Sequence, residues 1–387
     1  MGLFLNLLHL PEDVTNDALE GIYKALSDGH DHGDGEGIWS PHESPLIRRL
    51  VELFTQRGLD RLEAVKKAVL DWQSGANHKP GDAPIHAPNG MVQRWGPDEL
   101  ALARAYLEAL PPAQWTLDDH MLAIDLVVQT YLPADQLVKE AEWLAVRAGM
   151  MGKVQAAMTA AATLSQADKI LAAMPSTVAG AAQQFNLEHA QRAMLDFARA
   201  RAAEQVQALA DSARHRLRTI IAADLEQRAF GSVPAGTSSL QTKLMDAFGD
   251  LNRDWRRIAV TEAGEAQTQG FIASLKPGTK VKRIEQYKGA CNFCRRIHGV
   301  VAEVVAPDHP DKNPDTMVWP GKNNIGRSAS PRKRVGDVLV ARDPDEMWWL
   351  PAGLAHPHCR GRWVLVGDLP QGGNSEFTAT LTQILRG

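Results

Sequence analysis

Cysteine is scarce in this sequence, long apolar runs are missing, and neither sign of charge dominates. Three cysteines in 387 residues are too few for a framework of disulfide bonds, so a reducing cytoplasm is the expected compartment. The longest weakly polar stretch, residues 156–164, is far shorter than the roughly 20 residues that cross a bilayer, and we expect no membrane partner. The apolar first eight residues lack the basic region and cleavage site of a signal peptide, and we expect them to be packed structure.

Motifs of several enzyme classes are also absent. The sequence contains no G-x-S-x-G, no G-x-x-x-x-G-K-[ST] and no H-E-x-x-H, so we expect no enzymatic activity. Hydrophobic residues make up 44% and charged residues 23%, which is the composition of a globular protein and excludes wholesale disorder. The length favours two or three domains over a single core.

The small net charge of −4 conceals a difference between the two parts of the chain. Residues 251–387 hold 20 Lys and Arg against 14 Asp and Glu, a net charge of +6, whereas residues 1–250 hold 22 against 32, a net charge of −10. An acidic front and a basic back indicate two parts that meet different partners.

The periodicity of apolar residues predicts a predominantly helical α+β fold. Gly- and Pro-rich stretches at 28–45 and 74–97 and a change of composition near Gly231 divide the chain into a helical region at 1–97, a helical region with a long helix at 98–231, and a small α+β domain at 232–387. The last domain is expected to contain one helix, over 239–274, and four short strands. Their Val- and Ile-rich runs lie at 281–287, 300–305, 335–340 and 363–366.

Helix boundaries follow from prolines and glycines. The spacing predicts one helix from Pro45 to Arg57, a second over 62–72, and nearly continuous helix from Pro97 with breaks at 111–112, 133 and 149. On the long helix beyond residue 186, the charged side chains that alternate with the apolar set are expected to form a solvated face. They are Arg199, Arg201, Arg214, Arg216 and Arg218.

All three cysteines lie in the last domain, in a pattern that suits a metal. Cys291 and Cys294 form a C-x-x-C pair, and Cys359 lies far downstream beside His356 and His358. Zinc prefers four tetrahedral thiolate and imidazole ligands, which predicts a structural zinc site of Cys291, Cys294, His356 and Cys359, with His358 as the alternate ligand. The alternatives are buried core thiols, a disulfide bond involving Cys359, or a redox-active pair.

The order of these elements resembles the phage head-morphogenesis family, the Mu F-like minor capsid proteins of tailed bacteriophages. In that family a helix with a Thr-Glu element precedes Cys-x-x-Cys and Asp-Gly, and the domain ends in His-Pro-x-Cys-Arg-Cys. This chain has Thr261-Glu262, then the C-x-x-C pair, and then His356-Pro357-His358-Cys359-Arg360, a resemblance that covers residues 245–367. It departs from the family at His298, where the family has Asp, and at Gly361, where the family has its last Cys.

The resemblance implies a structural role in the virion. Such proteins take part in head morphogenesis at the portal vertex and accompany packaged DNA, which implies the portal protein and the major capsid or scaffolding protein as partners. The expected location is the phage head, with the host cytoplasm during assembly.

The basic last domain is compatible with contacts to packaged double-stranded DNA that do not depend on sequence. The loop 321–334 is expected to be flexible and basic, the alternative being a solvated surface with no ligand. The candidate residues are Arg295, Arg296, Lys322, Arg327, Arg332, Lys333 and Arg334.

Two other functions remain open at this point. A metal-dependent nuclease or processing enzyme would use a histidine base such as His298 or His309, and substitution of either residue would then abolish activity. A zinc-stabilised binding module unrelated to phage would purify without capsid components. The pair Trp348-Trp349 is expected to pack in a core, the alternative being an aromatic anchor for a partner.

An N-terminal group of metal-ligating residue types lies in a glycine-rich setting that does not fit the calcium-loop pattern. We expect a polar loop there. Its members are His30, Asp31, His32, Asp34 and Glu36.

Overall fold

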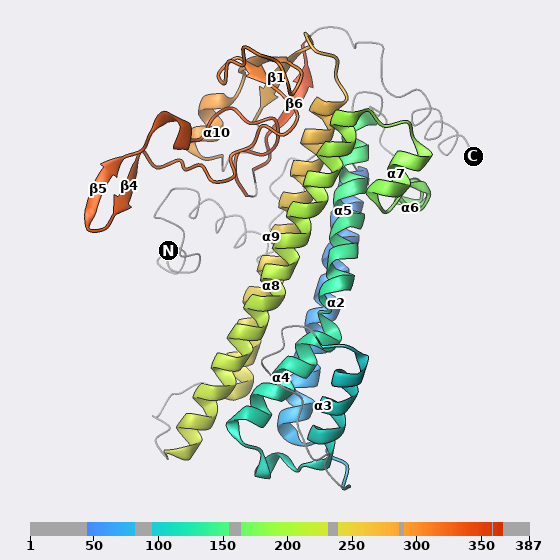
Figure 1. The fold of residues 1–387 in the computed structure, drawn as a ribbon, viewed down its shortest axis with the longest axis vertical. Helices are drawn as coiled ribbons and strands as arrows, with labels where there is room; N and C mark the ends of the chain where they lie inside the picture. Colours follow the sequence, from blue (N-terminus) through green and yellow to red (C-terminus); the bar gives the residue numbers. More distant parts are fainter. Residues whose placement is uncertain are drawn as a thin grey trace. The chain divides into compact units, whose positions relative to one another are not determined.

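The computed structural model describes residues 45–81, 95–154, 164–230, 239–285, 290–357 and 359–366. These residues form long helices followed by a small C-terminal sheet of short strands, which confirms the predicted predominantly helical α+β class (Figure 1). The predictions for the first eight residues, for the boundary near Gly231, for His358 and for the cluster around His30 to Glu36 lie outside the described residues.

The chain divides into two compact units that are not continuous in sequence. The first contains Met1–Leu53, Ala141–Ala202 and Arg257–Gly387, and the second contains Phe54–Glu140 and Ala203–Arg256. Four long helices therefore contribute a segment to each unit. The three-part division at residues 97 and 231 stays a prediction.

The helices account for most of the described chain. They are α2 (Pro45–Ser74), α3 (Pro97–Ala109), η1 (Pro112–Gln114), α4 (Leu117–Tyr131), α5 (Ala134–Val154), α6 (Leu164–Ala173), α7 (Val178–Gln184), α8 (His189–Ala229), α9 (Leu240–Ala273), α10 (Asn292–Ile297) and η2 (Pro344–Glu346). Within the described residues, none of these helices combines the length and the apolar character that a bilayer span requires.

Helix α2 is a single helix where two were predicted, one ending at Arg57 and one over 62–72. The helix continues through Gly58, which makes room for a neighbouring side chain. A Cβ atom at Gly58 would lie 1.8 Å from the Trp255 ring, so only glycine lets the indole lie against the helix backbone. The Trp255 ring stacks on Phe54 with centroids 5.3 Å apart, and its Nε1 donates to the Phe54 carbonyl oxygen at 3.1 Å. The predicted break at Gly149 is wrong in the same way, since α5 runs through it.

The C-terminal sheet has four strands in the order β3-β2-β1-β6. Strand β1 (Lys280–Ile284) is central and pairs antiparallel with β2 (Val301–Val304) and with β6 (Arg362–Leu365), and β2 pairs in parallel with β3 (Met317–Val318). Three of the predicted strand runs correspond to β1, β2 and β6, and β3 lay outside every predicted run.

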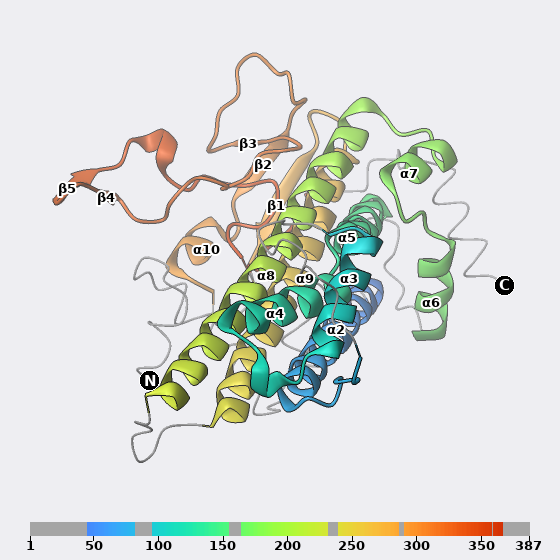
Figure 2. The same cartoon turned by 60° about the horizontal axis from the view of Figure 1, so that its bottom comes forward.

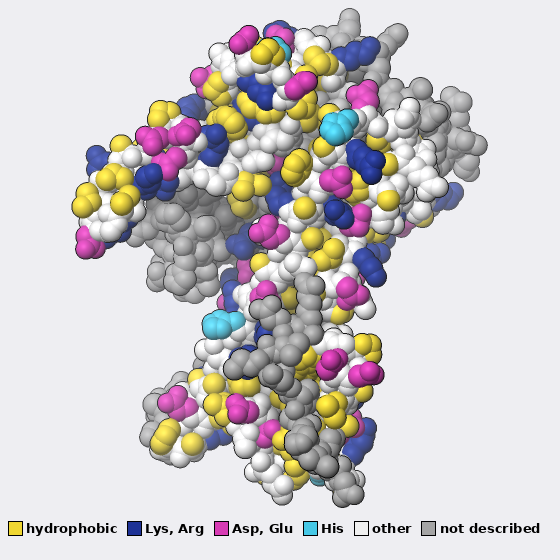
Figure 3. Space-filling model, viewed as in Figure 1, with side chains coloured by type: hydrophobic (Ala, Val, Ile, Leu, Met, Phe, Trp, Pro, Cys, Tyr) yellow, Lys and Arg dark blue, Asp and Glu magenta, His cyan; other side chains and the backbone are white. Residues whose placement is uncertain are grey.

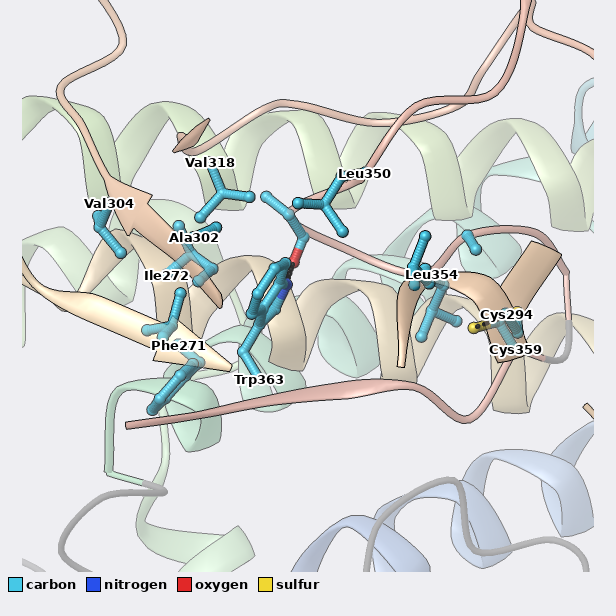
Figure 4. Close-up of a cluster of buried hydrophobic side chains, with 14 of the residues drawn as sticks. Phe271, Ile272, Cys294, Ala302, Val304, Val318, Leu350, Leu354, Cys359 and Trp363 are labelled. Carbon is cyan, nitrogen blue, oxygen red and sulfur yellow. Dashed lines mark hydrogen bonds between the residues drawn. The ribbon is translucent and has the colours of Figure 1, made fainter. Parts of the chain in front are cut away.

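One face of this sheet packs on the end of α9. Phe271 and Ile272 of α9, Val281 of β1 and Trp363 of β6 are buried in one cluster (Figure 4). Two indole hydrogen bonds hold Trp363, because its Nε1 donates to the carbonyl oxygens of Pro351 and Ala352 at 3.2 and 3.1 Å. The segment that follows β5 is thereby attached to the sheet, and this segment carries His356 and Cys359.

Strands β4 (Arg332–Val335) and β5 (Val338–Ala341) form a separate hairpin, which lies apart from the four-stranded sheet in both ribbon views (Figures 1 and 2). Its turn contains Gly336 at φ +60°, a backbone conformation that favours glycine. Basic and hydrophobic side chains both reach its surface (Figure 3), with Val335, Val338 and Leu339 each more than half exposed.

Candidate metal centre

The C-x-x-C pair is presented by a tight turn at the start of α10. Cys291 is the N-cap residue of this helix, and its sulfur accepts a hydrogen bond from the backbone N–H of Cys294 at 3.5 Å. The two side chains therefore leave the chain within one helical turn and point to the same side, which is how a short knuckle supplies two metal ligands.

The second half of the site comes from the segment after β5. The backbone N–H of Cys359 donates to the carbonyl oxygen of His356 at 3.0 Å, and this turn brings the imidazole and the thiol together. His356 Nε2 lies 3.4 Å from Cys291 Sγ and 3.2 Å from Cys294 Sγ, and Cys359 Sγ lies 3.8 Å from Cys294 Sγ. Figure 4 shows Cys294 and Cys359 side by side at one end of the core.

Three of the six distances among these four atoms are close to the edges of a tetrahedron around zinc. Zn–S and Zn–N bonds of about 2.3 and 2.05 Å imply sulfur–sulfur edges of about 3.8 Å and sulfur–nitrogen edges of about 3.5 Å. The separations of 3.8, 3.4 and 3.2 Å match those values to within about 0.3 Å. Cys291, Cys294, His356 and Cys359 can therefore hold a metal ion, and all three thiols are free.

The imidazole of His356 is oriented for this role. Its Nδ1 lies 2.8 Å from the carbonyl oxygen of Pro357, which can only accept, so Nδ1 carries a hydrogen and Nε2 faces the sulfurs of Cys291 and Cys294. Metal-bound histidines typically have their second nitrogen held by such a carbonyl group. Trp348 stacks on the ring at 5.4 Å between centroids, which fixes the plane of the imidazole.

The pKa values of the four groups shift in opposite directions, with two thiols held as anions and the other two groups held protonated. The hydrogen bond from the Cys294 thiol lowers the pKa of Cys291 to about 3 against the opposing effect of burial. Burial opposes ionisation of Cys359 too, but the hydrogen bond from Cys294 and the charge of Arg283 hold its pKa well below the usual range. Cys294, which donates to both thiolates, has a raised pKa. Burial disfavours the charged form of His356, but its hydrogen bond to Cys291 raises its pKa to about 9.

A buried ion pair that was not predicted from the sequence adjoins the cysteines. Arg283 is completely buried, and its Nη2 lies 3.0 Å from Glu285 Oε1 and 3.5 Å from Cys359 Sγ. Burial raises the pKa of Glu285 to about 8. Arg283 lies two residues after the buried Val281 on β1, and Glu285 follows the strand in the same alternation, so the alternation of buried and exposed positions was the available signal.

The Thr-Glu element lies in the same unit as the metal centre and is tied to the segment that carries it. Glu262 pairs with Arg201 of α8 at 2.7 Å, and Arg201 also lies 3.1 Å from Glu265. Glu265 in turn accepts from the backbone N–H of Leu354, two residues before His356. Burial raises the pKa of Glu262, and Arg201 opposes that shift. The expectation of a solvated face is wrong for Arg201, which pairs with buried carboxylates.

The predicted DNA-contact residues fall into different environments. Lys322 is buried, its ammonium donates to the carbonyl oxygens of Pro314 and Met317 at 2.5 and 2.7 Å, and burial lowers its pKa to about 7. Its assignment as a DNA contact is therefore wrong, because the buried nitrogen lies against the rings of both Trp319 and Trp349 and cannot reach a phosphate.

The other basic candidates lie nearer the surface. Arg327 lies 3.6 Å over the Trp349 ring and donates to the Met347 carbonyl oxygen, and Lys333 pairs with Glu346 at 2.5 Å. The remaining candidates are exposed: Arg295, Arg296, Arg332 and Arg334. Residues 321–334 also form hydrogen bonds to the rest of the domain, for example from Asn324 Nδ2 to the carbonyl oxygen of Ala355 at 3.0 Å.

The tryptophan pair and the two candidate base histidines are engaged locally. Trp348 and Trp349 are half-buried, and their indole nitrogens donate to the carbonyl oxygens of Arg327 and Asn323. His298 Nδ1 accepts from the backbone N–H of Glu285 at 2.9 Å, and His309 Nδ1 accepts from that of Asp311 at 3.2 Å.

Comparisons of this chain with protein-family models, with curated proteins and with solved structures gave no match.

Proposed function

We propose that this protein is a structural, non-enzymatic minor head protein of a tailed bacteriophage, which acts in head morphogenesis at the portal vertex. Its partners are the portal protein and the major capsid or scaffolding protein, and its location is the phage head after assembly in the host cytoplasm. The C-terminal domain is held together by one zinc ion.

The observation that carries this proposal is the convergence of the three motif elements. The Thr-Glu element of α9, the C-x-x-C turn and the His-Pro-x-Cys-Arg segment are separated by tens of residues, yet they belong to one unit. Glu265, one turn after Glu262, binds Leu354, and His356 and Cys359 meet Cys291 and Cys294. This proximity is what a shared domain with these three motif elements would require, and it supports the proposal.

Zinc is the metal that these donors favour. Three thiolates and one imidazole are a ligand set typical of structural zinc sites, whereas catalytic zinc usually has three protein ligands and an open position. A bound zinc would join α10 to the segment before β6, and both flank the central strand β1. We therefore assign it a folding role and derive no reaction from it.

Packaged double-stranded DNA is a secondary partner in this proposal. The exposed Arg332 and Arg334 follow one another on the same face of the β4–β5 hairpin, and among the described residues no acidic side chain forms an ion pair with either. Such side chains suit phosphates and give a salt-sensitive, sequence-independent attraction.

The test is co-assembly. The chain is expressed with the portal, scaffolding and major capsid proteins encoded in the same genome, and procapsids are purified by sedimentation. We expect the chain in the particle fraction in few copies, and omission of the portal protein should remove it. A genome without capsid genes, or a chain that remains in the soluble fraction, would contradict the assignment. Purification with no capsid component but with one zinc per chain would favour a binding module unrelated to phage.

A further inference from the structure

The Arg283 guanidinium uses all three of its nitrogens inside the domain. Nε and Nη2 contact Glu285 Oε1 at 3.1 and 3.0 Å, Nη1 donates to the Gly353 carbonyl oxygen at 2.8 Å, and Nη2 also donates to Cys359 Sγ at 3.5 Å. Its carbon lies 5.5 Å over the Trp363 ring. A fully buried charge with this many fixed partners has one orientation, so it can position the Cys359 sulfur.

The donor atoms around the site form two overlapping sets that share Cys294. One set is Cys291, Cys294 and His356, and the other is Glu285, Cys294 and Cys359; in each set the ligand atoms lie within 4.8 Å of one another. Geometry alone would therefore allow Glu285 to be a metal ligand. It would also allow a second ion beside the first.

Arg283 decides between these arrangements. A cation bound by Glu285 and Cys359 would lie beside a guanidinium that is already 3.0 Å from the carboxylate and 3.5 Å from the thiolate. Like charges at such a distance in a buried site repel strongly. Arg283 is therefore the cation of the set formed by Glu285, Cys294 and Cys359, and no metal ion binds there. Cys359 is then available as the fourth ligand of the ion bound by Cys291, Cys294 and His356.

We infer that Arg283 and Glu285 are the positioning residues of a mononuclear Cys3His site. Arg283 holds the Cys359 sulfur and offsets the net negative charge that three thiolates leave around a divalent cation, and Glu285 holds Arg283 and is not a ligand. This inference rests on the zinc site proposed above. It goes further by defining the ligand set and by giving the ion pair a function.

Gly361 supports this arrangement independently. A Cβ atom at position 361 would lie 1.7 Å from Glu285 Oε1 and 2.2 Å from Arg283 Nη2, so the ion pair occupies the space that any side chain there would need. The Gly361 backbone N–H also donates to Cys359 Sγ at 3.4 Å. The buried pair therefore requires glycine at position 361, where the family has its last cysteine.

The first experiment measures metal binding to the full chain. Zinc affinity is measured by competition with a chromophoric chelator, and Co²⁺ is used as a spectroscopic substitute, since its thiolate charge-transfer band grows with each sulfur ligand. We expect one metal per chain and a band that falls by about a third in Cys359→Ser. Arg283→Met should bind zinc about 10- to 100-fold more weakly at unchanged stoichiometry, as is typical when an outer-shell partner is lost.

Glu285→Gln distinguishes a positioning residue from a ligand. The amide retains the shape of the carboxylate, so we expect one metal per chain, an unchanged Co²⁺ spectrum and an affinity loss no larger than that of Arg283→Met. A spectrum that shifts as it does in Cys359→Ser, or an affinity in Arg283→Met equal to that of the unchanged chain, would overturn the inference while leaving the zinc site intact. No metal bound by the unchanged chain would overturn the zinc proposal and this inference together.

A double-mutant cycle covers the case in which Arg283→Met does not fold. Gly361→Ala should weaken zinc binding in the unchanged chain, because its methyl group meets Glu285. Its effect should be several-fold smaller in the Glu285→Ala background, where that space is vacated. Equal effects of Gly361→Ala in both backgrounds would show that the pair does not fill this space and would overturn the arrangement.

Discussion

Gly270 of α9 lies directly against Gly149 of α5, with no room for a methyl group between the two helices. A Cβ atom on Gly270 would lie 2.2 Å from the Gly149 carbonyl oxygen, and one on Gly152 would lie 2.1 Å from the Gln267 carbonyl oxygen. Backbone meets backbone at both places, so the clash cannot be relieved by rotating a side chain. Small residues on both helices thus fix how closely α5 and α9 approach.

Gly270→Ala should therefore destabilise the protein although alanine favours helix. Overpacking typically costs about 1–3 kcal/mol, which exceeds the roughly 1 kcal/mol by which alanine is preferred to glycine inside a helix. The measurement is the midpoint of urea unfolding followed by circular dichroism. Gly249→Ala is the matched control, because Gly249 lies on the same helix and its Cβ would meet nothing within 4 Å. The control should be slightly stabilised, and a stabilised Gly270→Ala would contradict the close approach.

Arg214 is predicted to stabilise the second unit through the buried Asp125. Its Nε and Nη2 contact the two carboxylate oxygens at 2.6 and 2.7 Å, and Asp125 is only 1% exposed. Arg214→Met leaves that charge without its main partner and should cost about 3 kcal/mol in unfolding free energy, since Arg218 lies 3.8 Å away and replaces little of the pair.

Two variants test this explanation. Arg214→Met combined with Asp125→Asn removes the charge as well as its partner and should recover part of the loss. Arg228→Met breaks a pair with Asp224 on the same helix whose arginine is 65% exposed, and should cost about 0.5 kcal/mol or less. A similar cost for Arg214→Met and Arg228→Met would mean that burial of Asp125 does not matter.

His120 predicts a pH dependence with a definite sign. Burial lowers the pKa of this imidazole below its ordinary value of about 6.5, against a smaller opposing effect of Asp119. The unfolded chain therefore takes up a proton at a pH where the folded chain does not. The stability from neutral His120 is complete above about pH 6.5 and decreases as the pH falls toward the folded-state pKa.

The measurement is the unfolding free energy in urea between about pH 7.5 and pH 4.5. This range includes the pKa of about 6.5 that histidine has in the unfolded chain. His120→Gln cannot take up the proton and should lose less stability over this range than the unchanged chain. Because other groups titrate equally in both proteins, the difference between the two curves isolates His120. Parallel curves would show that His120 has an ordinary pKa in the folded state.

The β4–β5 hairpin predicts which arginines contact DNA. Arg332→Gln and Arg334→Gln should each lower the slope of log affinity for double-stranded DNA against log salt concentration by about 1, because each removes one phosphate contact. Lys333→Gln is the control on the same strand, since the Lys333 ammonium is already paired with Glu346. Equal slopes for all three variants and the unchanged chain would remove the hairpin from the proposed DNA surface.

Periodicity predicted the elements better than it predicted their contacts. The helix predicted over 239–274 corresponds to α9 at Leu240–Ala273. Apolar residues that recur every three to four positions indicate such a helix without knowledge of its neighbours. The first helix was predicted to end at Arg57, and Gly149 was predicted to break a helix, because the sequence does not distinguish a glycine that makes room for a neighbour from one that ends a helix. The neighbour, Trp255 or α9, is known only from the fold.

The residues of the candidate metal centre were predictable, but their surroundings were not. Thiol and imidazole spacing indicated the four candidate ligand residues, and the structure brings them into one cluster that could hold a metal. Arg283 was not identified because a charged residue in a short strand usually faces solvent, and only the tertiary partners Glu285 and Cys359 explain its burial. Lys322 was predicted as a surface residue but is buried. Its basic neighbours in the sequence suggested a DNA contact, whereas its ammonium packs against two tryptophan rings.

Zinc removal should loosen the C-terminal sheet and leave the other unit unchanged. At about 1,000 times the dissociation constant, bound zinc stabilises the folded state by about 4.1 kcal/mol, and a chelator removes that contribution. We expect about one zinc per chain by elemental analysis, with Cys291, Cys294 and Cys359 protected from a thiol reagent until chelator is added. Hydrogen exchange should then rise in β1, α10 and β6, while α3 and α4 serve as the internal control. Three thiols that react at the same rate with and without chelator would mean that the cluster is held by packing alone, and the role of the metal in this domain would have to be given up.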